Sequence, residues 1–178
     1  MATDNSAPGD LDLVRRFVNT NDVEAGADEI DTPARLAAWL SANGLPAGRL
    51  RSADVRRAIE VREGLRSLLL ANNGDSLDPA AIAALNHAAP VVAVSFDPEG
   101  GSSLAAKGAV IDQALAQIYD AVFCAMTEGT WGRLKACRDD TCQWAFYDRS
   151  KNRSGTWCSM EVCGNRNKAR KFRARHKS

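Results

Sequence analysis

The segment that decides the fold is residues 137–163, "CRDDTCQWAFYDRSKNRSGTWCSMEVC", which begins and ends with a cysteine. Four residues separate Cys137 from Cys142, four separate Cys158 from Cys163, and fifteen lie between the two pairs. Two close pairs with a hairpin-sized spacer are typical of a tetrahedral zinc site with four thiolate ligands. Because four protein ligands leave no open coordination position, we expect one structural Zn²⁺ ion.

Disulfides and free thiols are the alternative states of these cysteines. The first ten residues, "MATDNSAPGD", lack the basic and apolar regions of a signal peptide, and no apolar run approaches the ~20 residues that span a bilayer. We therefore expect a cytoplasmic protein with no membrane partner, in which thiols stay reduced and disulfides are rare. The four-residue spacing also excludes a redox pair of the CxxC type.

Charge is distributed unevenly along the chain. Residues 133–178 hold 13 Lys or Arg and 4 Asp or Glu, a net charge of +9, whereas residues 1–132 carry −8. This asymmetry predicts two parts with different functions. In an alternative interpretation, the basic part docks on the acidic part and has no external partner.

The first part is predicted to be a helix-rich α+β domain over residues 11–130, after a disordered leader at 1–10. Residues 11–30 begin with a helical repeat, although a strand is also tenable there. Clearer helices are expected at 31–43, with Thr32 as cap, at 52–72, with Ser52 as cap, and from Asp78 onward. A hairpin is expected over 91–107 and an amphipathic helix over 109–126, with Phe123 facing inward.

This part contains none of the common catalytic motifs. It has no nucleotide-binding glycine loop, no metalloprotease helix and no nucleophile elbow. His87 lacks the base and nucleophile partners that catalysis requires, and Cys124 is interpreted as a small core residue. We therefore do not expect an enzyme.

The second part is predicted to be a treble-clef-like finger over residues 131–178 that ends in a basic helix. Residues 143–148 form a strand, 149–155 a turn, and 156–157 return to Cys158. The helix begins between Ser159 and Gly164, and Val162, Ala169 and Phe172 are expected to pack against Trp144 or Phe146. The candidate nucleic-acid contacts on this helix are Asn165, Arg166, Lys168, Arg170, Lys171, Arg173 and Arg175.

Asn165 and Arg166 have a second interpretation. They lie next to Cys163, so they are also candidates to support the zinc site through hydrogen bonds to sulfur. The phosphate-binding interpretation is stronger for the cations further from the metal. We expect Lys177 to extend the basic face, with fraying beyond His176.

The segment "WCSMEVCGNRNKARKFRAR" closely resembles the signature of CGNR-type zinc fingers, and "ACRDDTCQWAFYDRSKNRS" resembles the segment before it. Upstream, "FVNT", "TPARLAAWL" and "VREGLRSLL" are similar to the bacterial ABATE domain that is paired with this finger. The resemblance implies an α+β N-terminal domain, zinc on the four cysteines and stress-linked regulation of transcription. Two departures are Arg16, where the family usually has Asp, and the uncharged residues 154–156 before Trp157, where the family tends to be basic.

Three functions remain open at this point. The first is a DNA-binding regulator, with the basic helix in the major groove and the N-terminal domain sensing a small-molecule ligand or a protein partner. The second is an RNA binder that stacks bases on Trp144, Phe146 and Tyr147. The third is a zinc-stapled protein-interaction module with no nucleic-acid target. A homodimer is expected for the first, since short reading helices commonly act in pairs.

Overall fold

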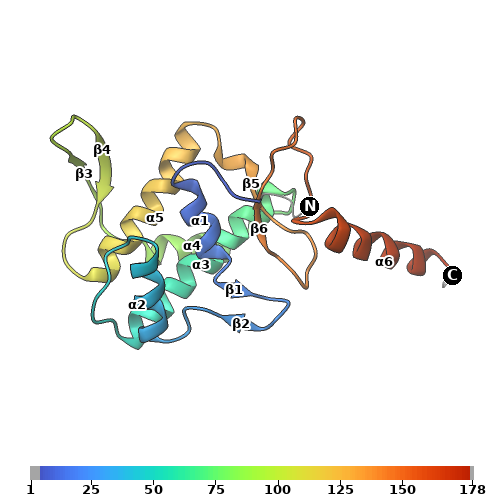
Figure 1. Cartoon of the computed structure of the whole chain (residues 1–178), viewed down its shortest axis with the longest axis horizontal. Coiled ribbons are helices and arrows are strands. Elements are labelled where there is room, and N and C mark those ends of the chain that lie inside the picture. Colours follow the sequence, from blue (N-terminus) through green and yellow to red (C-terminus); the bar gives the residue numbers. More distant parts are fainter. Residues whose placement is uncertain (1–4, 177–178) are drawn as a thin grey trace.

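The computed structural model describes residues 5–176. Helices form an N-terminal body, and a further helix projects from the C-terminal part (Figure 1). The helices of the body are α1 (Leu11–Val18), α2 (Pro33–Ala42), α3 (Ser52–Asn72), α4 (Pro79–Ala88) and α5 (Val110–Thr127). Short antiparallel strand pairs accompany them, which confirms the predicted α+β class. Within the described residues, no helix combines the length and apolarity needed to cross a membrane.

The helix ends follow the capping residues of the sequence. Thr32 and Asp78 cap α2 and α4, and each accepts a backbone N–H of the first turn, at 3.3 and 2.9 Å respectively. The predicted cap at Ser52 is wrong by one residue. Arg51 precedes α3 instead, and its N–H donates to the Asp54 carboxylate at 2.7 Å.

Helix α3 is the centre of the body and packs against α1, α2 and α4. Of the apolar residues expected on its inner side, Val55, Leu65 and Leu69 are buried, and Ile59 and Leu68 are partly buried. Arg62 and Arg66 are buried too, at 2% and 3% exposure. Arg62 donates to both oxygens of Asp28 at 2.8 Å. Burial raises the pKa of Asp28, but the hydrogen bonds from Arg62 and the Ile30 N–H, together with the positive charge of Arg62, hold the pKa below its usual value. This ion pair connects α3 to the hairpin of β1 (Asn21–Asp22) and β2 (Ala27–Asp28).

The other strands form two more hairpins. β3 (Ala93–Phe96) pairs with β4 (Ser102–Ala105), as predicted for residues 91–107. β5 (Leu134–Ala136) pairs with β6 (Ala145–Tyr147) around the first cysteine pair. The strand at β6 was predicted, but its expected partner at 156–157 is wrong, because β6 pairs with the segment before Cys137 instead.

The inner face of α5 differs in part from the prediction. Phe123 is 54% exposed and Cys124 is exposed, whereas the sequence pattern placed both inside. The small residues Ala121 and Ala125 are buried instead, and α5 packs against α1. Because these alanines are small, α5 can pack closely there, and the larger side chain of Phe123 is left outside the interface. The buried residues that were predicted correctly are Ile111, Leu115, Ile118 and Val122.

The hydrophobic core extends from the body into the β5–β6 hairpin. Leu134, Ala136 and Ala145 are fully buried and belong to the same cluster as the helices. Cys137, Cys142 and Cys163 form a separate, smaller cluster with Trp144 and Trp157. The core therefore crosses the proposed domain boundary at residues 130–131.

Helix α6 (Asn165–Arg175) projects away from the body and has no buried residue (Figure 1). The predicted packing of its apolar side is wrong, since Val162 and Phe172 are 53% and 58% exposed. Phe146 is itself only 3% exposed, so its ring offers no surface for the helix. Phe172 stacks on His176 instead, with ring centroids 4.1 Å apart. The expectations for Lys177 and for fraying after His176 lie outside the described residues.

The leader contacts both parts of the molecule in the portion that the structure describes. Asn5 donates from Nδ2 to the Cys158 carbonyl at 2.9 Å and accepts the Tyr147 N–H at 3.1 Å. Ala7 is buried, and its N–H donates to Asp12 at 2.8 Å. Residues 5–10 thus have fixed contacts, in contrast to the disorder predicted for 1–10, while residues 1–4 lie outside the described part.

Candidate metal centre and basic helix

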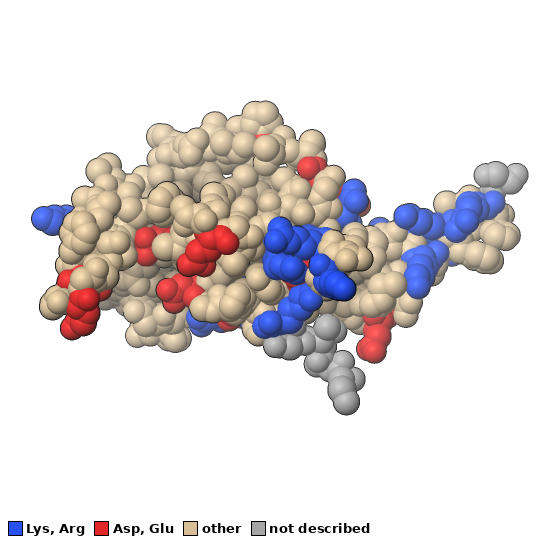
Figure 2. Space-filling view, turned by 90° about the horizontal axis from the view of Figure 1, so that it is seen from above, with Lys and Arg blue, Asp and Glu red and all other residues tan. Residues whose placement is uncertain are grey.

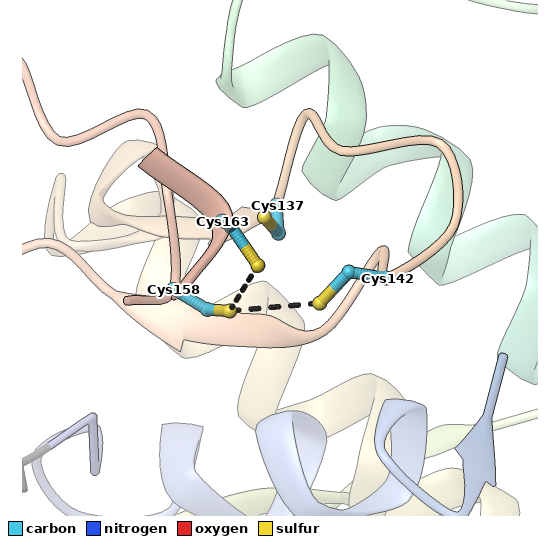
Figure 3. Close-up of side chains that lie close together, drawn as sticks. All are labelled: Cys137, Cys142, Cys158 and Cys163. Carbon is cyan, nitrogen blue, oxygen red and sulfur yellow. Dashed lines mark hydrogen bonds between the residues drawn. The ribbon is translucent and has the colours of Figure 1, made fainter. Parts of the chain in front are cut away.

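The first cysteine pair lies in the turn between β5 and β6. The Cys137 N–H donates to the Trp144 carbonyl at 3.0 Å, and the Cys142 N–H closes a tight turn on the Asp139 carbonyl at 2.8 Å. The Asp139 carboxylate strengthens this turn by accepting the N–H of Thr141 at 3.2 Å and its hydroxyl at 2.8 Å. The turn holds both sulfur atoms toward the same point (Figure 3).

The second pair lies where α6 begins. One wide helical turn, Met160–Gly164, precedes the helix. Ser159 caps this turn, since its Oγ accepts the Val162 N–H at 3.3 Å and its carbonyl accepts the Gly164 N–H at 3.1 Å. A Cβ at Gly164 would lie 2.5 Å from the Met160 sulfur, so a side chain there would displace the residue that packs over it. The turn thereby brings Cys163 toward Cys158.

The four sulfur atoms converge, and all lie within 4.8 Å of one another (Figure 3). The Cys158 sulfur is 3.6 Å from that of Cys142 and 3.7 Å from that of Cys163. Four Zn–S bonds of about 2.3 Å at tetrahedral angles place the sulfurs about 3.8 Å apart, whereas a disulfide requires about 2.05 Å. The spacing therefore fits four ligands of one zinc ion, and none of these cysteines is in a disulfide.

The cysteines also control one another's ionisation. Hydrogen bonds from the Cys142 and Cys158 thiols lower the pKa of Cys137 to about 2. Hydrogen bonds with Cys137 and Cys142 raise the pKa of Cys158, and burial raises the pKa of Cys163 to about 12. Thiolates at this distance repel one another, so they cannot all ionise without a cation. A divalent ion such as Zn²⁺ removes that repulsion, and soft thiolate donors select it.

Comparison with known families agrees with this site. Residues 11–128 match the ABATE family, described as "Putative stress-induced transcription regulator", and residues 133–176 match the CGNR zinc finger. The chain belongs to the ABATE family. A comparison with curated proteins gave no match. The finger of this ABATE protein carries one structural zinc ion, and its ligands are Cys137, Cys142, Cys158 and Cys163.

Two of the predicted nucleic-acid contacts are engaged within the ABATE protein itself. Arg170 donates to Oδ1 of Asp139 at 2.9 Å, and Arg166 lies 3.6 Å from Oδ2 of the same carboxylate. Arg166 also donates to the Thr141 hydroxyl at 2.9 Å and to Glu24 of the body at 2.6 Å. The start of α6 is thus tied to the first cysteine turn and to the β1–β2 hairpin. These contacts join Arg166 to oxygen atoms rather than to the sulfurs proposed from the sequence.

The other candidate contacts lie along the exposed helix. Asn165 donates to the Glu161 carbonyl at 3.0 Å, within its own turn. Arg173 and Arg175 each donate to a carbonyl in the preceding turn of their own helix, at 3.3 and 3.4 Å. A carbonyl oxygen carries no formal charge, so these bonds do not neutralise the two guanidinium groups. The exposed cations of α6 that make no ion pair among the described residues are Lys168, Lys171, Arg173 and Arg175.

Sequence reasoning missed several polar residues that build the finger. Asp139 is fully buried beneath α6, and Lys135 and Asp148 form an ion pair at 2.8 Å with both side chains buried. From the end of α3, the Asn73 side chain donates to carbonyls on both sides of the zinc site, each at 2.8 Å. The one signal for Lys135 is its position between Leu134 and Ala136 in an apolar run, which places it inside a short strand.

Proposed function

We propose that this protein is a DNA-binding transcriptional regulator of the bacterial cytoplasm, consistent with the stress-response description of its family. The observation that carries the proposal is α6, a cationic helix that projects from a zinc-anchored base and leaves its length beyond the first turn accessible (Figures 1 and 2). An α-helix fits the major groove of duplex DNA, where lysines contact phosphates and arginines can also contact guanine edges.

The contacts of α6 divide its cations into two groups. We assign Arg166 and Arg170 to holding the helix on the finger, because both face Asp139. DNA contact then falls to four residues, namely Lys168, Lys171, Arg173 and Arg175. If all four reach phosphates, log K should fall with log salt at a slope of about −3.6.

Fluorescence anisotropy with mixed-sequence duplex DNA tests the proposal. The zinc-loaded protein is titrated at several salt concentrations, and a chelated sample is the control. We expect binding at micromolar or tighter Kd that weakens steeply with salt and disappears with the metal. Absence of binding at low salt would contradict the proposal.

RNA is the second candidate target. It is favoured by Trp144 and Tyr147, two partly exposed aromatic residues of the finger on which unpaired bases can stack. Phe146, the third residue proposed for stacking, is buried. Competition between duplex DNA and single-stranded RNA of equal length distinguishes the two targets. Binding to neither would favour the protein-interaction module.

We further propose that the body binds the regulatory ligand in a cleft of about 510 Å³ between α1, the end of α2, β4 and α5. Polar side chains line it, among them Arg16, Asn43, Gln113 and Asp120. Arg16, which replaces the usual Asp of the family, donates to Asn43 there. Arg16 is also paired with Asp12 at 3.3 Å, and Asp120 faces the same cleft, so the ligand should be a small polar molecule that offers both donors and acceptors. Arg16→Asp should weaken its stabilising effect in a thermal-shift screen of small polar compounds.

The same geometry supports a non-catalytic protein. Four thiolates complete the coordination of zinc, so no position remains for a substrate or a reactive water. We propose that the metal organises the finger and takes no part in chemistry. A homodimer, which would pair two α6 helices on one site, is tested by sedimentation of the DNA complex.

A further inference from the structure

A second group of cations lies beside α6, between β6 and the second cysteine pair. We call residues 149–153 the basic loop, and its cationic side chains are Arg149, Lys151 and Arg153, all exposed. Figure 2 looks down on the loop that stands above the finger in Figure 1. Lys and Arg side chains gather there and again along α6, on one face of the molecule, while most of the acidic side chains in this view lie over the body.

A buried ion pair supports the basic loop from beneath. The Lys135 ammonium donates to the Asp148 carboxylate at 2.8 Å and to the carbonyls of Arg153 and Gly155 at 2.6 and 3.0 Å. Asp148 in turn accepts the N–H groups of Ser150 and Gly155 at 2.9 and 2.8 Å. Both charges are about 4% exposed. A buried pair of this kind adds little net stability, so its clearest effect is to fix the path of the loop.

Two backbone features show that the path of the loop is specified closely. A Cβ at Gly155 would lie 2.7 Å from the Asp148 carboxylate, so only glycine lets the backbone approach this group. Arg153 has a φ of 53°, a left-handed conformation that costs free energy for an arginine. The Lys135 contact to its carbonyl holds it there.

The charges of the loop are arranged for an anionic partner. Asp148, the carboxylate next to the loop, is turned inward and neutralised by Lys135. Arg149 is placed by its contacts to the Tyr147 ring, 5.6 Å from the guanidinium, and to the Ser6 carbonyl at 3.0 Å. Lys151 and Arg153 lie on the exposed side of the loop. The outer face therefore presents positive charge, and its geometry is fixed before any ligand arrives.

We propose that the basic loop is a second phosphate-binding surface, which contacts the DNA backbone beside the groove that α6 occupies. This inference rests on the proposed function. Residues 154–156, directly before Trp157, are uncharged, but Lys151 and Arg153 place positive charge earlier in the same segment. The helix supplies groove contacts, and the loop fixes the orientation of the helix on the duplex.

Salt dependence separates one binding surface from two. Four phosphate contacts on α6 alone predict a slope of about −3.6, and two further contacts from Lys151 and Arg153 predict about −5.4. The difference is measurable with one protein and one duplex. It depends on the number of phosphates neutralised and not on the identity of the bases.

The decisive variant is Lys151→Gln/Arg153→Asn in the full-length, zinc-loaded chain. Asparagine tolerates the left-handed conformation at position 153, so the loop keeps its path without its charge. The matched control is Arg49→Gln/Arg56→Gln, which removes two exposed charges from the body, near the end of α3 that is distant from the finger. Zinc content and thermal unfolding establish that both variants are folded, and anisotropy is then measured across salt concentrations.

We expect the loop variant to bind duplex DNA roughly 30-fold more weakly near physiological salt, with a slope less steep by about 1.8. The control should retain wild-type affinity and slope. If the loop variant binds duplex DNA with the affinity and salt slope of the wild type, the role of the loop is overturned and the proposed function stays intact. A wild-type protein that fails to bind duplex DNA would overturn both.

Discussion

At the scale of single residues, the finger depends on carboxylates that are turned inward. Asp139 is fully buried, and its Oδ2 has no hydrogen-bond partner among the described residues. Burial raises its pKa, but hydrogen bonds from Arg170 and Thr141 outweigh this and leave the pKa below its usual value. Arg170 therefore compensates a buried charge, although the sequence shows it only as one more cation on a basic helix.

Arg170 and Lys171, which are adjacent in sequence, should have separable roles. Arg170→Gln leaves the buried Asp139 charge without its hydrogen-bonded cation, so we expect a loss of about 1–3 kcal/mol in the free energy of unfolding. Lys171→Gln should leave stability within about 0.5 kcal/mol and reduce the salt slope of DNA binding by about 0.9. Urea unfolding and anisotropy on the same two variants measure both effects. Equal destabilisation by the two substitutions would contradict this division of roles.

Asp148 should make the stability of the finger depend on acid pH. Burial raises its pKa, but bonds from Lys135 and Ser150 outweigh this and lower the pKa from 3.8 to about 2. Because the folded-state pKa is depressed, the stabilisation is present above about pH 4 and is lost as pH falls toward 2. We expect Asp148→Asn to cost about 2–3 kcal/mol at neutral pH.

The measurement is the free energy of unfolding in urea, compared between wild type and Asp148→Asn at several pH values. A difference is needed because acid also protonates the zinc-bound thiolates in both proteins. The difference should shrink as the pH falls below 4. If it stays constant, the Asp148 carboxylate is not held by Lys135 in solution.

Single buried charges are what sequence reasoning could not locate. Lys135, Asp139 and Asp148 are of residue types that lie mostly on surfaces, and periodicity does not distinguish a buried one from an exposed one. The partner of Arg62, Asp28, is 34 positions away, so the pair forms only when the fold brings the two together. The cysteines were predictable because metal ligation imposes a spacing on the sequence itself.

At the scale of secondary-structure elements, α6 depends on zinc for its position. Its first turn is fixed by Cys163 on one side and by the Arg166 and Arg170 contacts on the other. No side chain of the helix is buried, so packing does not hold it in place. An isolated helix of 11 residues is only marginally stable in water, so we expect α6 to form because its first turn is anchored.

Cys163→Ser should therefore abolish stoichiometric zinc binding and α6 together. A hydroxyl is a poor replacement for a thiolate ligand, and the remaining three cysteines leave the site open. We expect the loss of zinc to coincide with a fall in helical circular dichroism. Cys124→Ser is the matched control, since Cys124 is exposed on α5 and outside the cluster. Retention of one zinc ion by the Cys163 variant would contradict the four-ligand site.

Elements with a local signal were predicted well, and those fixed by distant packing were not. Thr32, Asp78 and the apolar stripe of α3 are local signals, and those helices lie where they were expected. The packing face of α6 was wrong because three apolar residues at helical spacing do not reveal whether a surface is available to receive them. In this fold the candidate surface, Phe146, is already buried.

At the scale of the whole molecule, the finger and the body share an apolar core on one side of the zinc site only, and polar contacts such as that of Asn73 to the Thr156 carbonyl join the other side. The β5–β6 hairpin contributes Leu134, Ala136 and Ala145 to the core of the body, and Asn73 of α3 donates to the Ala136 carbonyl. The second cysteine pair and α6 lie beyond that core. The charge asymmetry of the sequence predicted two parts. It could not show that the boundary between their apolar cores lies inside the finger, after the β5–β6 hairpin.

Removal of zinc should therefore unfold part of the molecule. Chelation releases the second cysteine pair and α6, whereas β5 and β6 remain held by apolar contacts with the helices of the body. We expect DNA binding to be lost. The helical circular dichroism signal should fall only by about the contribution of α6, which is small because α6 has 11 residues and α3 alone has 21. Hydrogen exchange should show loss of protection after residue 157 and retained protection in α3 and β5. Added zinc should restore both signals, and cooperative unfolding of the whole chain on chelation would show instead that the metal holds the body together as well.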